Sequence, residues 1–90
     1  MAISPEDIQS FREEIKALLA ESDDDSVEFS ICDIALLQQL DSSGEPIWEF
    51  MAENYQPAEG RKNIWELFEA VSNEFEIEQD GFEDFYVSPV

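Results

Sequence analysis

Clustered carboxylates are the residues in this sequence whose spacing could do chemistry. The densest cluster is EFEIEQDGFEDF at positions 74–85, where six of twelve residues are acids grouped around one glycine. Carboxylate oxygens are the ligands that Ca²⁺ and Mg²⁺ prefer. They can also present negative charge to a basic protein, or they can simply keep a small domain in solution. These three uses compete for the same residues.

The cluster shares part of its spacing with a calcium-binding EF-hand loop. Counting twelve positions from Glu76 places glycine at position six and acids at positions one, three, five and nine. Position twelve, where a bidentate glutamate is required, is Val87, so the segment is not an EF-hand. We expect an irregular acidic loop that offers several oxygens to one calcium ion, with a solvated loop or a partner-binding face as the alternative. The candidate metal ligands are Glu76, Glu78, Asp80 and Asp84.

A second group of acids lies between positions 21 and 28 and includes a run of three aspartates. We expect both groups to lie where helices end. Cation binding is reasonable at such places, because cations favour the negative end of a helix dipole. For Asp23, Asp24 and Asp25 we favour helix capping and solvation, and as the second interpretation these residues are a further candidate metal set. Asp41 and Glu45, on either side of Gly44, fit the ordinary chemistry of a turn.

The overall charge narrows the choice of partner. The chain has 23 acids and four bases, which gives a net charge of −19. Four scattered cations cannot form a basic face, so we expect no direct binding to nucleic acid or to acidic membranes. The excess of acids instead favours a basic protein as partner. A DNA mimic, an inhibitor or an immunity protein that blocks a nucleic-acid-binding protein would have this composition.

Catalysis is not expected from these residue types. The chain has no histidine and one cysteine, so the usual general base and a thiolate metal cage are both missing. The sequence also lacks an apolar run of about 20 residues that could span a bilayer, and its start is polar within four residues. We therefore expect a cytoplasmic protein that is not an enzyme.

Hydrophobic periodicity predicts the elements that must position the acids. Helices are expected from Pro5 to about Ala20, across 34–40, across 47–51, and from Asn63 to Phe75, because apolar residues recur there at helical spacing. Segment 27–31 alternates as a strand would, and the tail after Gly81 could add a strand beside it. We therefore predict one domain over 1–90, a mainly α compact bundle of about four helices with room for one short β pair.

Three resemblances accompany this interpretation. A small, histidine-free, strongly acidic domain with carboxylates at Asp23–Asp25 and Glu76–Asp84 resembles the CcbP-like calcium-binding proteins of cyanobacteria. That resemblance implies a cytoplasmic Ca²⁺ buffer or regulator with more than one site. Segment 66–78 is similar to the end of the second helix and the following loop of acyl carrier proteins. Segment 40–51, with NEFEIE at 73–78, resembles the peptide-recognition winged-helix domains of modified-peptide pathways.

Overall fold

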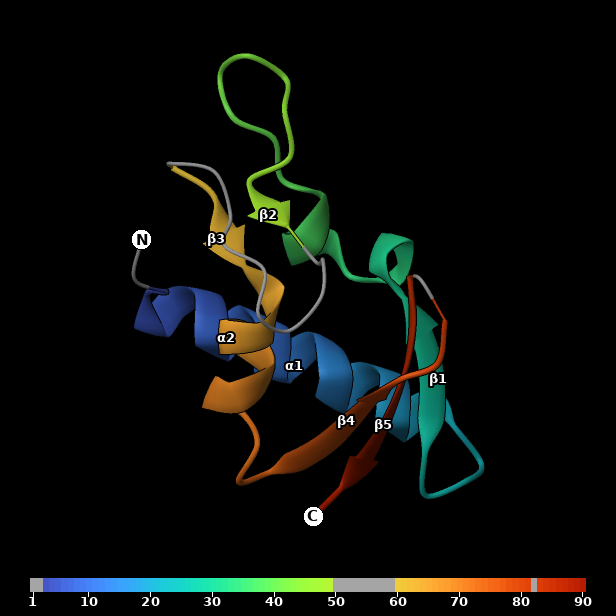
Figure 1. Cartoon of the computed structure of the whole chain (residues 1–90). Coiled ribbons are helices and arrows are strands. Elements are labelled where there is room, and N and C mark those ends of the chain that lie inside the picture. Colours follow the sequence, from blue (N-terminus) through green and yellow to red (C-terminus); the bar gives the residue numbers. More distant parts are fainter. Residues whose placement is uncertain (1–2, 50–59, 82) are drawn as a thin grey trace.

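The computed structural model describes residues 3–49, 60–81 and 83–90 (Figure 1). In that part of the chain, two α-helices pack with a three-stranded antiparallel sheet, and two very short strands form a separate parallel pair. The expected mainly α bundle is therefore wrong, and the protein is a mixed α/β domain. The elements, in chain order, are α1 (Pro5–Glu21), β1 (Val27–Ser30), the 3₁₀ helices η1 (Ile31–Asp33) and η2 (Ala35–Gln38), β2 (Trp48–Glu49), β3 (Lys62–Asn63), α2 (Ile64–Ala70), β4 (Phe75–Gln79) and β5 (Asp84–Pro89).

Helix α1 forms where its local signals predict it. The Ser4 side chain accepts a hydrogen bond of 3.2 Å from the backbone N–H of Asp7, and Pro5 opens the first turn. Phe11 and Ile15, one turn apart, are both fully buried and fix the face that turns to the core. The helix continues to Glu21, one residue beyond its predicted end.

The three-stranded sheet has β5 in the centre, between β1 and β4. Segment 27–31, which alternates as a strand does, forms one over Val27–Ser30 against the tail, with Phe29 opposite Phe85, while Ile31 already belongs to η1. The acidic segment after α2 is also a strand, because β4 pairs with β5 and places Ile77 opposite Val87. The irregular acidic loop expected over 76–84 is therefore a β-hairpin, and Phe75 belongs to a strand and not to the preceding helix.

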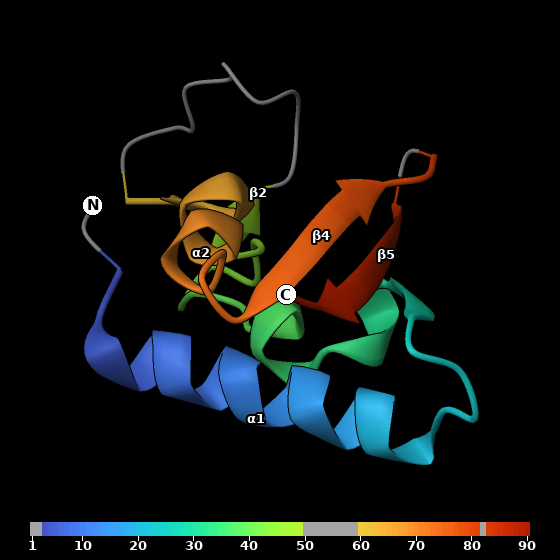
Figure 2. The same cartoon turned by 90° about the horizontal axis from the view of Figure 1, so that it is seen from below.

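Side chains alternate between the two faces of this sheet, as strand geometry requires. The face that turns inward carries apolar residues, and those at its centre are buried: Phe29, Phe75, Phe85 and Val87. Both helices lie on the side of this apolar face, as the two orthogonal views show (Figure 2). The other face of the sheet has no helix over it in the described part of the chain.

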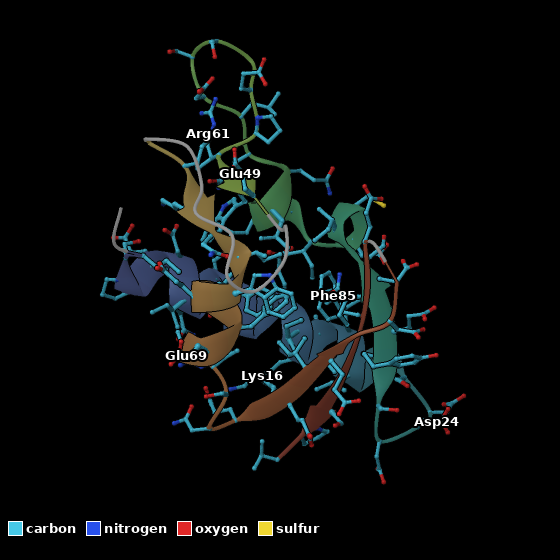
Figure 3. All side chains as sticks on the ribbon, in the orientation of Figure 1. Lys16, Asp24, Glu49, Arg61, Glu69 and Phe85 are labelled. Atoms are coloured by element: carbon cyan, nitrogen blue, oxygen red, sulfur yellow. The ribbon has the colours of Figure 1, made fainter. Side chains whose placement is uncertain are left out.

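Phe68 of α2 is the centre of the aromatic core. Its ring centroid lies 5.6 Å from that of Phe11 on α1, 6.5 Å from Phe29 on β1 and 5.1 Å from Phe85 on β5. The labelled Phe85 side chain points from the sheet into the interior (Figure 3). One residue therefore joins both helices to the sheet, and contacts of this kind add about 0.5–1.5 kcal/mol per aromatic pair beyond the area they bury.

Two further helix predictions need correction. The helix expected across 34–40 is the 3₁₀ helix η2, which ends at Gln38. In the segment 47–51, where a helix was expected, Ile47 is a bend and Trp48–Glu49 form a strand, while positions 50 and 51 lie outside the described residues. Trp48 is opposite Lys62 in the parallel pair. Lys62 Nζ lies 5.3 Å from the centre of the Trp48 ring and 2.6 Å from the Asp7 carboxylate, so it ties this pair to α1.

Candidate functional site

The favoured calcium ligands lie along one hairpin and do not surround one point. Glu76 and Glu78 are exposed on the outward face of β4. Asp80 and Asp84 face each other where the hairpin turns, and the Asp80 N–H donates a bond of 2.8 Å to the Asp84 carbonyl. Within the described ranges, no three Asp, Glu or Cys side chains form a group that could hold one metal ion. The calcium site is therefore without geometric support and stays a prediction.

The second candidate set lies elsewhere on the molecule. Asp23, Asp24 and Asp25 occupy the turn between α1 and β1, and all three are exposed. The labelled Asp24 lies at the outer end of this loop and points away from the body of the protein (Figure 3). The Ser22 hydroxyl accepts a bond of 3.2 Å from the backbone N–H of Asp24, so side-chain capping helps to shape this turn. The two candidate metal sets therefore lie apart in the structure.

The sheet instead brings together a group of acids that the sequence had divided between separate segments. Glu28 on β1 and Glu78 on β4 both lie directly opposite Tyr86 on the central strand. Asp84, two residues before Tyr86, lies opposite Ser30. The outward face of the sheet therefore carries five exposed acids around one tyrosine, and we call this group the acidic sheet face: Glu28, Glu76, Glu78, Asp80, Asp84 and Tyr86.

Among the described residues, no positive charge lies on the acidic sheet face to balance it. The three strands contain no Lys or Arg. Three of the four cations form ion pairs elsewhere: Arg12 with Glu74, Arg61 with Asp41, and Lys62 with Asp7. The fourth, Lys16, lies on α1, which packs on the opposite side of the sheet.

This arrangement of acids opposes folding. Neighbouring outward positions are about 5 Å apart across strands and about 7 Å apart along one strand. Two like charges about 6 Å apart repel by roughly 0.7 kcal/mol in water, and Asp and Glu are also poor strand residues. Threonine at the same positions would be better for the sheet. A feature that lowers stability without a local gain is typical of a functional surface.

Sequence reasoning identified four of the five acids but assigned them the wrong element. It missed Glu28 as a member of the group and missed Tyr86 altogether. The alternation of Phe75 and Ile77 with Glu76 and Glu78 has the period of a strand and could have identified the correct element. Glu28 and Tyr86 join the group only through the strand register.

The turn at 41–45 behaves as expected. Asp41 Oδ1 accepts bonds from the Ser43 N–H at 2.8 Å, the Ser43 hydroxyl at 2.6 Å and the Glu45 N–H at 3.1 Å. Its other oxygen forms an ion pair with Arg61. Figure 3 labels Arg61 and the nearby Glu49. Asp41 is therefore engaged in holding its own turn, which confirms the prediction of turn chemistry.

Comparison with family models, with curated proteins and with solved structures returns no match. The resemblance to the CcbP-like proteins is untested by these comparisons. The expectation that the protein is not an enzyme also stays a prediction. No helix in the described ranges is long and apolar enough to cross a membrane.

Proposed function

We propose that this protein uses its acidic sheet face to bind a basic surface of another protein, in the manner of a nucleic-acid mimic. The observation that carries the proposal is the outward face of the sheet, with five exposed carboxylates and no Lys or Arg. A protein that normally binds phosphates presents Lys and Arg at the matching surface. The acidic sheet face would compete with nucleic acid for that surface and so inhibit the partner. We place this activity in the cytoplasm.

The sheet suits such a partner better than it suits a single ion. Side chains on one face of a sheet stand roughly parallel to each other, about 5–7 Å apart. Calcium needs its oxygens to converge to about 2.3–2.6 Å from one point. A basic protein surface, in contrast, can meet a row of separated charges with a row of its own. Charge complementarity of this kind accelerates association and makes it sensitive to salt.

A calcium buffer or regulator is the second candidate function. It rests on one observation about the backbone: the Asp80 N–H donates to the Asp84 carbonyl across the turn that contains Gly81, so the two acids lie at opposite positions of the hairpin. Two carboxylates and nearby backbone carbonyls could form part of a calcium site if other oxygens, such as water, completed it. The same protein preparation tests both candidates.

The test is affinity capture from cell lysate at low ionic strength with the tagged full chain. We expect the wild-type protein to retain a basic nucleic-acid-binding protein that elutes with NaCl or with excess duplex DNA. The chelator EGTA should not release it. Elution by EGTA alone would instead support the calcium function.

Two matched triple variants show whether the face itself is responsible. Each replaces three exposed glutamates by glutamine, so each changes the net charge from −19 to −16. The face variant carries Glu28→Gln, Glu76→Gln and Glu78→Gln, and the control variant carries Glu6→Gln, Glu13→Gln and Glu69→Gln on the two helices. We expect the face variant to lose the partner and the control variant to keep it. Equal retention by both variants, or equal loss, would contradict the proposal.

A further inference from the structure

Tyr86 is the one aromatic residue in the acidic sheet face, and it lies at the centre of it. Its side chain is 45% exposed although β5 is the middle strand of the sheet. The register places Glu28 directly beside it on one neighbouring strand and Glu78 directly beside it on the other. A continuous row of carboxylate, phenol ring and carboxylate therefore crosses all three strands.

Packing within the sheet does not account for this tyrosine. Aromatic residues on the outer face of a sheet normally gain stability from apolar or aromatic neighbours on the adjacent strands. Both direct neighbours of Tyr86 are charged instead. The other exposed large apolar residues in the described part of the chain are Leu40, on the turn at 40–46, and Val90, at the chain end. Tyr86 alone of these three is surrounded by acids.

The neighbouring carboxylates also disfavour ionisation of the phenol, which is neutral at physiological pH even at its usual pKa. Glu28 has the largest effect and Asp80 the next, and both raise the pKa of Tyr86 above its usual value near 10. The face thus presents an uncharged aromatic ring within reach of anionic oxygens.

An aromatic ring flanked by carboxylates is better matched to arginine than to lysine. A guanidinium group is planar and weakly hydrated, so it can stack on the ring while its N–H groups donate to the carboxylates. The lysine ammonium is a compact and strongly hydrated charge that gains less from the ring. Cation–π contacts are modest at exposed sites and become stronger when the pair loses water.

Building on the proposed function, we propose that Tyr86, Glu28 and Glu78 form an arginine-binding position at the centre of the acidic sheet face. The surrounding acids attract any basic surface. The position at Tyr86 then selects a partner that presents an arginine side chain there. Tyrosine and arginine are both enriched among the residues that dominate binding energy at protein interfaces.

The test compares two fluorescent peptides of equal length and charge, one rich in arginine and one rich in lysine. Each is titrated with the full-length protein at the same ionic strength, and binding is measured by fluorescence anisotropy. We expect the wild-type protein to bind the arginine peptide about three- to tenfold more tightly, as a modest cation–π contact requires. The Tyr86→Leu variant should bind both peptides equally, whereas Tyr86→Phe, which keeps the ring, should retain most of the preference.

The outcomes separate this inference from the function on which it depends. If neither peptide binds, or if the face variant described above binds as well as the wild type, the proposed function fails. If both peptides bind through the face with equal affinity, the proposed function stands and the arginine position is refuted. A preference for arginine that survives Tyr86→Leu would also refute it. Thermal melts of both Tyr86 variants provide the folding control.

Discussion

Asp41 shows how much of the local structure one side chain can hold. It accepts three hydrogen bonds within its own turn and forms an ion pair with Arg61, which is 20 residues away. These partners favour the ionised form, so the pKa of Asp41 lies well below its usual value. The Ser43 side chain has the largest effect, followed by Arg61 and the Glu45 backbone N–H. The turn and the start of β3 are thereby linked.

We expect Asp41→Asn to lower the thermal midpoint at neutral pH and to have less effect in acid. A carboxylate whose pKa is lower in the folded than in the unfolded state adds stability above its unfolded pKa, and that stability is lost as the pH falls through the folded pKa. Thermal melts of wild type and variant between about pH 7 and about pH 3 should therefore show that the difference between their midpoints becomes smaller as the pH falls. A difference that stays constant over this range would show that the Asp41 charge does not stabilise the fold.

Phe68 is the residue whose replacement should lower the free energy of unfolding most. We expect Phe68→Ala to lower the free energy of unfolding by about 3–5 kcal/mol, because removal of a buried ring leaves a cavity. Small domains are stable by only about 5–15 kcal/mol in total, so urea denaturation should show a large shift of the midpoint. Tyr86→Leu, which changes an aromatic residue on the opposite face of the sheet, is the control and should stay within about 0.5 kcal/mol of wild type. Equal effects of both substitutions would contradict the assignment of Phe68 to the core.

At the scale of elements, local signals predicted the first helix and allowed one strand pair between 27–31 and the tail, but they did not predict the three-stranded sheet. Ser4, Pro5 and a one-sided apolar stripe act within a few residues of each other, so α1 could be located from sequence. The segment after α2 was ambiguous, because Phe75 fits both the helical period that includes Val71 and the alternation that includes Ile77. The pairing of β4 with β5 decides between them, and pairing is a tertiary property that propensity does not encode.

Prediction of the candidate site from the sequence was limited in the same way, because the site depends on strand pairing. The local density of acids identified Glu76, Glu78, Asp80 and Asp84, but it could not show which face they would occupy. Glu28 joins them only because β1 pairs with β5, nearly 60 residues further along the chain. The role given to Tyr86 could not be expected without this register. Composition could therefore predict that carboxylates matter, while topology decides how they are presented.

The turn of the β4–β5 hairpin depends on glycine. Gly81 has φ +122°, a backbone conformation that L side chains rarely adopt. We expect Gly81→Ala to destabilise the protein by about 1–3 kcal/mol through backbone strain, although its Cβ would meet Asp84 Oδ2 only at an ordinary 3.6 Å. Hydrogen exchange at the Asp80 N–H, measured by NMR, should become faster. Ser88→Ala on the same hairpin is the control, and equal effects of the two substitutions would argue against strain at Gly81.

For the whole molecule, net charge is the dominant electrostatic fact. A charge of −19 on 90 residues opposes compaction by self-repulsion. We expect NaCl to raise the thermal midpoint, because salt screens exposed charges, and each 1 kcal/mol gained raises it by about 4–8 °C for a domain of this size. A midpoint that falls or stays constant with added NaCl would contradict a destabilising role for these charges.

The same thermal melts can distinguish specific calcium binding from general screening of charge by salt. Melts in CaCl₂, in MgCl₂ and in NaCl with chelator at equal ionic strength differ only through specific binding. A calcium site filled at a hundredfold excess over its dissociation constant should add about 2.7 kcal/mol of stability over the magnesium control. Equal midpoints in calcium and magnesium would instead leave the acidic sheet face with the protein-binding function alone.

The outer strands of the sheet, β1 and β4, each have one side with no strand partner in the described part of the chain. Charged side chains are a common protection for such edges, since they prevent two copies from extending one another's sheet. Here that protection consists of protonatable groups only, and it disappears near the isoelectric point of about 4.1. Solutions of this protein should therefore stay clear during storage at neutral pH and become turbid close to pH 4, which light scattering would record.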